Sequence, residues 1–565
     1  MRRQRRGLRL LALILGLSLV AAACGDDDDD EGAGEEAAPE EEEAQQGGEV
    51  VDLGTFVGDP PEHLDPALNT TLDAYQVVNA VYDGLTDIDA SDPDNPEIVP
   101  QVAETVESNE DATEWTFTIR EGLTFAGGEE ILPSTFQRSW ERASDPEFAG
   151  DYSYLFNFIQ GGAEKLEGTA DTLEGVEVDD ENMTLTVTLA EPYSNFDAVA
   201  GFQLFMPVPE EAGTDAATAA EWENGEMFGN GPFMLESPRT DTEIVLVPNP
   251  DWDGTQYDEA FELPEQPYVD RLTFRVSTDP DTSYNSFEAG EGDTAQIPPG
   301  RVSEATSPYA NTTDVAILGS YHFDVNHRDP VVGGDENLEL RKAIMQAIDR
   351  DEINEAVYEG IRTVSNGITP PGIPGFGEDL CDDCVYDPEA AQEHFDNWQA
   401  EGNELTEPLR IQFNIGAGHE PVVAIIIDNL AAIGIEAVEE GIDTETYFTQ
   451  IAEGACQICR TGWFADYPTY DNFMYDLFHT DSLGGNNHGF SNPEFDELVD
   501  QAKQTTDPEE QAELFQEAES ILLDEVGTIP LNWYRGDYVF NEDKLGGFTQ
   551  SNFGLIPWEK VFVKS

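Results

Sequence analysis

The chain has 565 residues and carries 118 Asp and Glu against 25 Lys and Arg, a formal net charge of −93. This acidity argues against nucleic acids and anionic membrane surfaces as partners, because proteins bind both through Lys and Arg. Hydrophobic residues make up 39% of the sequence, which supports a large core, and the length indicates two or three lobes rather than one.

The N-terminus has the pattern of a secretory signal. Met1 to Arg6 is basic, Leu8 to Ala23 is mostly apolar, and three alanines precede Cys24. A cysteine directly after small residues resembles the bacterial lipobox, in which that cysteine is acylated and becomes the first residue of the mature protein. We therefore expect an extracytoplasmic protein that is anchored to the cell membrane by lipidated Cys24. The alternative is an ordinary signal peptide with an incidental cysteine.

An acidic spacer follows the signal. Residues 25–50 have no hydrophobic periodicity and are dense in Asp and Glu. Like charges at this density repel one another and keep a chain extended. We expect residues 1–23 to be the signal peptide and residues 24–50 to be a lipidated, disordered tether, with the globular protein starting at about Val51.

Strand and helix patterns are mixed in the first half of the globular region. Val51–Phe56 and Ile244–Val247 have the character of short strands, and Trp115–Arg120 alternates like a half-buried strand. Val176–Ala190 predicts a hairpin with an acidic turn, whereas Asp73–Tyr82 has helical spacing. Interleaved patterns of both kinds predict an α/β fold.

Helical patterns dominate from residue 338 onward. Leu338–Tyr358 has apolar residues at helical spacing, and Pro421–Ile433 is an apolar helix. Asp387-Pro388 and Asn492-Pro493 each begin a helix with Pro at its first position, and Asp507–Leu523 is amphipathic. The tail from Ile529 returns to strands.

An ordered set of short motifs runs through the globular region. It includes Leu64-Asp65-Pro66, Trp115–Phe125, Gly229–Phe233, Leu340–Arg350 and Arg460–Tyr467. In this order the motifs resemble the substrate-binding proteins of ABC importers, in the dipeptide/oligopeptide-binding family. The resemblance implies a two-lobed, periplasmic-binding-protein-like α/β fold with an extra inserted domain.

The same resemblance implies domain boundaries. Lobe 1 would hold domain I, made of residues 51–95, 230–318 and 531–565. Domain II, residues 96–229, would be inserted into it. Lobe 2 would be domain III, residues 319–530, and the two lobes would close on a ligand.

The stretch around Arg460 is the ligand site that the resemblance implies. Asp466 matches the family residue that holds a peptide amine, and Arg460 and His419 match residues that meet the peptide carboxylate. Arg suits that role because its planar guanidinium can bind a carboxylate through two hydrogen bonds. Trp463 matches the wall of a side-chain pocket, and the main chain of Gly462 to Phe464 would pair with the ligand backbone.

Other interpretations of these residues stay open. Asp466 could cap a turn, Arg460 could pair with an acid of the protein itself, and Trp463 could belong to the core. In a regular strand Arg460 and Asp466 share one face and Trp463 lies on the other. At Thr70 the chain departs from one peptide-binding subgroup, which has an acidic residue at about that position. We keep Thr70 as a ligand-binding candidate.

The cysteines form two CxxC pairs. They are Cys381 with Cys384 and Cys456 with Cys459. In a cytosolic chain two such pairs would suggest a zinc site, but exported cysteines usually oxidise. We expect disulfides, either within each pair or between the pairs, with zinc and free thiols as the alternatives.

The sequence contains no HExxH, GxSxG, Walker A loop or dinucleotide-binding fingerprint. We therefore expect a binding protein without catalysis, cofactor or metal, which captures oligopeptides or dipeptides and delivers them to ABC permease subunits. We expect it to be a monomer that touches the membrane only through its lipid. Alternatives are a receptor of the same family for a nickel chelate, haem or oligosaccharide, and, from another class, a surface hydrolase or a scaffold.

The net charge of the chain predicts a salt dependence. Self-repulsion of this size is screened poorly in dilute salt and much better in brine, so the acidity is typical of adaptation to a saline habitat. The melting temperature should therefore rise between low and molar NaCl. A melting temperature that stays constant or falls would contradict this interpretation.

Overall fold

The computed structural model describes residues 46–58, 60–89, 96–148, 150–225, 227–258, 261–482 and 484–565. The predicted signal peptide, most of the acidic tether and Cys24 lie outside these ranges. None of the helices in the described ranges is both long and apolar enough to cross a membrane.

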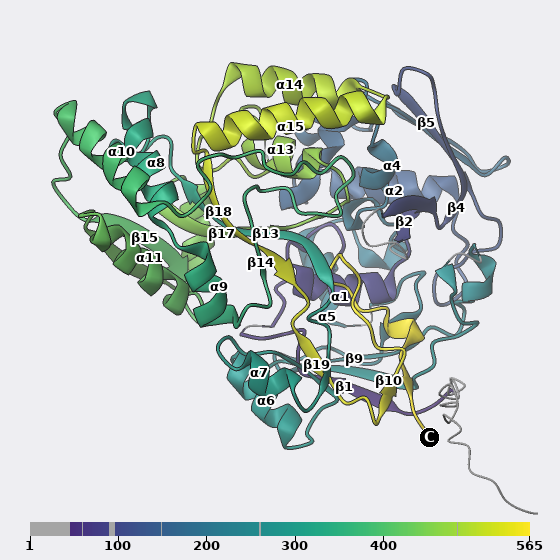
Figure 1. Cartoon of the computed structure of the whole chain (residues 1–565). Helices are drawn as coiled ribbons and strands as arrows, with labels where there is room; N and C mark the ends of the chain where they lie inside the picture. The colour runs from purple at the N-terminus through teal and green to yellow at the C-terminus, as the bar shows by residue number, and fades with distance from the viewer. Residues whose placement is uncertain are drawn as a thin grey trace, which may run out of the picture. The chain divides into compact units, whose positions relative to one another are not determined.

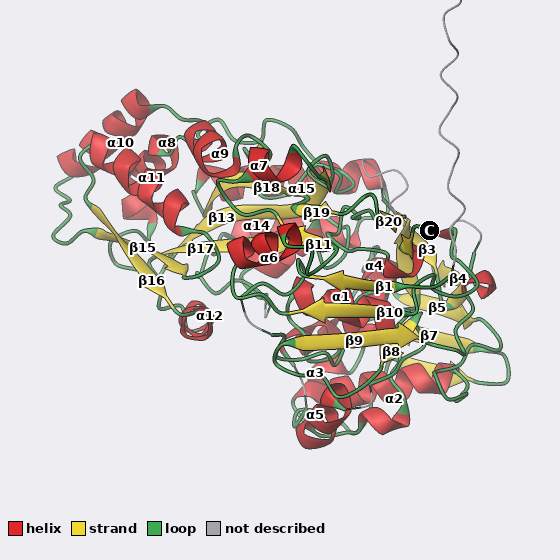
Figure 2. Ribbon diagram, turned by 90° about the horizontal axis from the view of Figure 1, so that it is seen from below, coloured by secondary structure: helices red, strands yellow, loops and turns green. Residues whose placement is uncertain are grey.

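Two large sheets organise the described chain (Figures 1 and 2). The first collects strands from distant parts of the sequence, with β1 next to β10 in parallel register. Its described strands, in spatial order, are β12 (Ala310–Asn311), β19 (Tyr538–Phe540), β11 (Thr294–Gln296), β1 (Glu49–Asp52), β10 (Arg271–Arg275), β9 (Glu243–Pro248) and β8 (Phe233–Leu235).

The second large sheet holds β13 at its centre, buried along all but its first residue. β13 pairs antiparallel with β17 on one side and with β18 on the other. In spatial order the described strands are β14 (Thr363–Val364), β18 (Thr528–Arg535), β13 (Ala316–Val325), β17 (Ile458–Phe464), β15 (Leu409–Asn414) and β16 (Ala437–Ile442).

Three smaller sheets complete the strands of the described chain. The hairpin predicted at Val176–Ala190 is confirmed as β6 and β7, which belong to a sheet with β4 and β5. The described strands of the smaller sheets are β4 (Ala103–Ser108), β5 (Glu114–Ile119), β7 (Thr184–Thr188) and β6 (Val176–Asp179), then β2 (Thr86–Asp89) with β3 (Glu97–Pro100), and β20 (Leu545–Gly546) with β21 (Phe562–Val563).

Helices cover the sheets, and in the C-terminal half α14 and α15 lie side by side (Figure 1). The described α-helices are α1 (Leu72–Val81), α2 (Pro133–Ala143), α3 (Gly162–Leu166), α4 (Phe196–Ala200), α5 (Ala216–Asn224), α6 (Pro280–Glu288), α7 (Val302–Thr306), α8 (Leu338–Ala347), α9 (Arg350–Tyr358), α10 (Pro388–Ala400), α11 (Glu420–Ala432), α12 (Thr444–Ala452), α13 (Asp471–Phe478), α14 (Pro493–Gln504) and α15 (Pro508–Asp524).

The helix starts predicted from Asp or Asn followed by Pro are confirmed. Asp387 and Asn492 each accept hydrogen bonds from two backbone N–H groups in the first turn of α10 and α14. The single helix predicted over Leu338–Tyr358 is wrong. Ile348 is extended and Asp349 caps a new helix through the N–H of Glu352, so α8 and α9 are separate.

A buried ion pair joins the loop before α1 to α2. Asp65 accepts hydrogen bonds from both terminal nitrogens of Arg142, at 3.1 and 2.5 Å, and both side chains are buried. The guanidinium also lies 4.0 Å from the ring centre of Phe148. Asp65 belongs to the Leu-Asp-Pro motif, so that motif serves here to attach an early loop to a helix almost 80 residues later.

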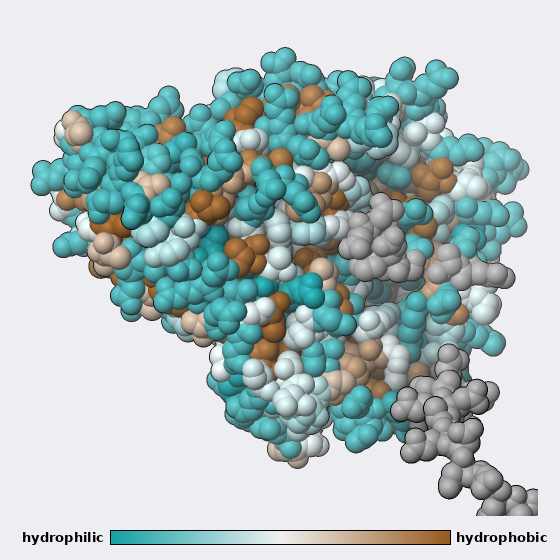
Figure 3. Space-filling view, in the orientation of Figure 1, coloured by the Kyte–Doolittle hydropathy of each residue, from teal (hydrophilic) through white to brown (hydrophobic). Residues whose placement is uncertain are grey.

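The face of the molecule seen in Figure 3 is largely hydrophilic, with hydrophobic residues exposed in small scattered patches. Apolar side chains are instead gathered into separate buried clusters, one around the sheet of β4–β7 and others around each large sheet. The fold therefore confines its acidic excess to the surface and to a few buried carboxyl groups.

Replacing Arg142 with Met should destabilise the protein strongly, because it leaves the Asp65 carboxylate buried and unpaired. Breaking a buried pair costs about 3–5 kcal/mol. Arg410→Met, which removes a half-exposed pair with Glu440 at 3.6 Å, is the matched control and should cost about 0–1 kcal/mol. Calorimetric melting of both variants would test this, and equal losses would contradict it.

Candidate functional site

A cavity of about 350 Å³ is lined by residues that belong to, or lie next to, both large sheets. Its size is at the lower end of the range for small-molecule sites. Polar and charged residues of its wall are Asp73 and Gln76 of α1, Thr55, Gln296 of β11, Tyr321 of β13, Tyr358 of α9, Arg362, Asn414 of β15, His419, Arg460 of β17, Tyr534 and Arg535 of β18, Asp537, Tyr538 of β19 and Gln550.

Arg460 enters this cavity from β17 among tyrosine rings. Its guanidinium carbon lies 4.8 Å from the ring centre of Tyr321, and one terminal nitrogen donates to the Tyr534 hydroxyl at 3.2 Å. The Nε atom of Arg460 is buried without a hydrogen-bond partner, and no carboxylate among the described residues pairs with the guanidinium. The alternative that Arg460 serves an internal ion pair therefore finds no partner in the described chain.

His419 lines the same cavity at the start of α11. Its Nδ1 atom lies 3.1 Å from the Tyr321 hydroxyl, whereas its Nε2 atom is buried and has no partner. Burial lowers the pKa of His419, and the charges of Arg460 and Arg362 lower it further. The imidazole is therefore neutral, and its Nε2 atom can form one hydrogen bond with a ligand.

Strand β17 keeps one edge open where it borders the cavity. β13 pairs with β17 along its whole length, but β15 pairs only with Ile458 and Cys459. From Arg460 to Phe464, Gly462 included, the second edge has no strand partner among the described residues. Phe464 also lines the cavity, with its ring stacked on Tyr534 at 4.6 Å. An open edge of this kind can pair with the main chain of an extended ligand.

Asp466 lies just beyond β17 and is not among the residues that line this cavity. Its carboxylate accepts from the Tyr152 hydroxyl at 3.2 Å and from the Asn472 side chain at 3.3 Å. Burial raises the pKa of Asp466 to about 8, and the nearby Asp476 carboxylate adds to the effect. No cation of the described chain pairs with this carboxyl group, so it can receive one from outside.

Trp463 lies on the β17 face opposite Arg460, as strand alternation predicts. Its ring packs on a hydrophobic cluster behind the sheet, and its Nε1 donates to Asn472 at 3.0 Å. Asn472 therefore connects Trp463 to Asp466. Thr70 is exposed and is not among the residues that line the cavity.

Sequence reasoning missed several residues of this region. Asp73 is reached by water inside the cavity, yet desolvation raises its pKa to about 7, and Asp537 contributes. Tyr321, Tyr534 and Arg362 form the surroundings of Arg460. They come from segments that are distant in sequence, so no local spacing could have grouped them.

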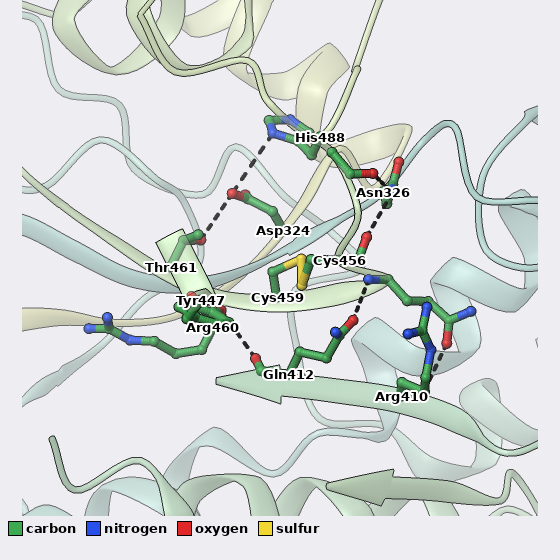
Figure 4. Close-up of a disulfide and its surroundings, with 12 residues drawn as sticks. Asp324, Asn326, Arg410, Gln412, Tyr447, Cys456, Cys459, Arg460, Thr461 and His488 are labelled. Atoms are coloured by element: carbon green, nitrogen blue, oxygen red, sulfur yellow. Dashed lines mark hydrogen bonds and ion pairs between the residues drawn. A yellow bond between two sulfur atoms is a disulfide. The ribbon is translucent and has the colours of Figure 1, made fainter. Parts of the chain in front are cut away.

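The four cysteines form disulfides, and each disulfide lies within one CxxC pair. Cys381 bonds to Cys384 and Cys456 bonds to Cys459, which leaves no thiolate of either pair for zinc. Cys459 of the second disulfide lies on β17, directly before Arg460. Figure 4 shows Arg460 pointing away from this disulfide, while Thr461 turns toward Asp324 and donates to it at 3.0 Å.

Comparison with known families decides the class of protein. Residues 97–485 match the model of the bacterial extracellular solute-binding proteins, family 5 middle region, which spans more than half of the chain. The chain belongs to this family. Its members are substrate-binding proteins of ABC transporters that act outside the cytoplasm, and the family predicted from the sequence is confirmed.

Relatives with assigned substrates resemble the chain over most of its length. The oligopeptide-binding protein OppA of Bacillus subtilis is 25% identical over 522 residues, which cover 89% of this chain and 91% of that protein. The dipeptide-binding protein DppE of the same organism is 27% identical over 498 residues, which cover 86% and 87%.

A solved structure supports the fold. The structure of OppA from Burkholderia pseudomallei matches with a TM-score of 0.76 at 22% identity, and the match covers 92% of this chain and 99% of that one. The predicted two-lobed α/β fold of the periplasmic binding proteins is confirmed. The domain boundaries and the ligand-binding roles stay predictions.

The raised pKa of Asp466 predicts how the empty protein responds to pH. Between pH 3.8 and about 8 the folded state retains a proton that the unfolded state releases, so this group stabilises the fold less as pH rises through that window. Asp466→Asn has no such proton. Its melting temperature should fall a few degrees less than that of the wild type between pH 5 and pH 8. Equal changes in melting temperature for the two proteins would contradict the raised pKa of Asp466.

Proposed function

We propose that the protein is a receptor that binds oligopeptides or dipeptides outside the cytoplasm and delivers them to an ABC importer. The observation that carries the proposal is the open edge of β17, which borders a cavity beside an arginine without a carboxylate partner. A peptide offers a main chain for the edge and a carboxylate for the arginine.

The two ends of the peptide would meet groups of opposite sign. Asp466 would bind the amine, because an ammonium ion would supply the cation that this half-buried carboxyl group lacks. Arg460 would bind the carboxylate, with His419 as a neutral hydrogen-bonding neighbour. Gly462 and Phe464 would contribute their main chain, and Trp463 and Thr70 would lie beside the ligand.

The remaining parts of the proposal concern the setting of the receptor. The lipidated Cys24 would hold the protein at the cell membrane, and the acidic tether would give the monomeric receptor reach toward the permease subunits. The receptor would carry no catalysis, and a separate subunit would hydrolyse ATP. The overall acidity would suit a saline habitat, and the domains would follow the boundaries predicted from the sequence.

A receptor of the same family for a nickel chelate, haem or oligosaccharide is the second candidate. An oligosaccharide site would stack sugars on aromatic rings and would not require Asp466 or Arg460. The cavity combines half-buried arginines with carboxyl groups, which suits a ligand with charges of both signs better than a neutral sugar. A surface hydrolase or a scaffold protein has no comparable support.

Binding of a tripeptide with a free amine should depend on Asp466. A charge-assisted hydrogen bond is worth about 1.5–3 kcal/mol, so Asp466→Asn should weaken binding by roughly 10-fold to 150-fold. Affinity for the wild type should also rise from pH 6 to pH 8, because Asp466 must lose its proton to bind an ammonium ion. Isothermal titration calorimetry over this range would measure both effects.

An N-acetylated tripeptide is the matched control. It lacks the ammonium ion, so its weaker binding should be the same for the wild type and for Asp466→Asn. If the substitution weakened both ligands equally, Asp466 would support the structure of the site and would not bind the amine.

A further inference from the structure

Arg362 and Arg460 differ from the other arginines that the structure describes. Every other described arginine pairs with a carboxylate or donates to a backbone carbonyl, and these are Arg120, Arg138, Arg142, Arg239, Arg271, Arg275, Arg301, Arg328, Arg341, Arg350, Arg410 and Arg535. The guanidinium of Arg362 donates to the side-chain oxygen of Asn532, and that of Arg460 donates to the Tyr534 hydroxyl. Neither has a carboxylate or a backbone carbonyl as partner among the described residues.

The two guanidinium groups share the same tyrosine rings. The carbon of the Arg362 guanidinium lies 5.5 Å from the ring centre of Tyr321 and 4.6 Å from that of Tyr534. Arg460 lies 4.8 Å from the Tyr321 ring and is hydrogen-bonded to Tyr534. Both arginines line the 350 Å³ cavity, so two positive charges lie around the same tyrosine rings. Arg535 also lines the cavity, but it donates to the backbone carbonyls of Thr313 and Asp314.

Unused hydrogen-bonding groups mark the same part of the wall. A guanidinium has five N–H donors, and the structure gives each of these two a single hydrogen-bond partner. The Nε of Arg460 is buried without a partner, and so is Nε2 of His419, a residue that is only 6% exposed. Stacking on tyrosines stabilises each cation but satisfies none of these donors.

Acidic residues elsewhere in the cavity act on the pair only at long range: burial raises the pKa of Asp537, and the charge of Arg362 acts against that shift. Asp537 lines the cavity and accepts from the Gln296 side chain at 2.9 Å, and Asp73 projects from α1. Neither forms an ion pair with Arg362 or Arg460 among the described contacts. The cavity therefore carries both signs, with the positive charge concentrated at the tyrosines.

We infer that the site selects peptides whose last residue is Asp or Glu. Arg460 binds the main-chain carboxylate and Arg362 binds the side-chain carboxylate of the same residue. Two adjacent guanidiniums, each able to bind a carboxylate through two hydrogen bonds, fit a residue that carries two carboxylates. The inference rests on the proposed peptide-binding function, and it makes Arg362 the residue that determines specificity at the carboxyl end.

The test compares Ala-Ala-Glu with Ala-Ala-Gln, which differ in one charge and hardly in shape. Titration calorimetry of the wild type should show Ala-Ala-Glu binding at least about 10-fold more tightly, as expected for an added charge-assisted hydrogen bond. Arg362→Gln should remove this preference, so that its affinities for the two peptides differ by less than about 3-fold. Arg362→Lys, which keeps the charge, should retain part of the preference. Arg410→Gln loses the same charge outside the cavity and should retain all of it.

Each other outcome overturns the inference in a distinguishable way. Equal affinity of the wild type for both peptides refutes the acidic preference and leaves peptide binding intact. If Arg362→Gln still prefers Ala-Ala-Glu, another residue determines the preference. If neither peptide nor a mixture of random tripeptides binds, the proposed function falls and the inference falls with it. If Arg362→Gln fails to fold, the wild-type comparison still tests the acidic preference, and Arg362→Lys still tests the role of Arg362.

Discussion

Strand β13 pairs with β17 and β18 at once, and the candidate site depends on that double pairing. The hydrogen bonds to β17 place Arg460 and Phe464, and those to β18 place Tyr534. Tyr321, on β13 itself, contacts Arg460, His419 and Tyr534. Because β13 is buried along nearly its whole length, these positions are fixed by the core of the sheet rather than by surface loops.

Charge is distributed unevenly between the surface and the site. Acids outnumber bases by 118 to 25, so potential carboxylate partners are in large excess over cations. Two arginines with neither a carboxylate nor a backbone carbonyl as partner among the described residues are therefore unusual. So are the buried Asp476, the half-buried Asp466 and Asp73 of the cavity wall, whose pKa values desolvation raises. Leaving these groups unpaired costs stability in the empty protein. A ligand with charges of both signs would recover part of that cost, which couples binding to stability.

Local signals in the sequence were sufficient to predict much of the fold. Asp387 and Asn492 before Pro predicted helix starts because capping and proline geometry act within one turn. The break at Ile348 escaped prediction because the apolar spacing continues across it, while Asp349 is fixed by a contact with Asn429 from α11. The same limit applies to the site. Arg460, Phe464 and His419 were chosen through the family resemblance and do meet at one cavity, whereas Arg362 and Asn472 act through contacts that only the folded chain creates.

The molecule that the purified protein carries would show most directly whether it is a peptide receptor. The protein can be purified without denaturation, observed by native mass spectrometry, and then unfolded so that the bound molecules are released and sequenced by tandem mass spectrometry. A peptide receptor should release a mixture of short peptides, with one peptide bound to each protein chain. Release of a sugar, a haem or a metal chelate in place of peptides would contradict the proposed function.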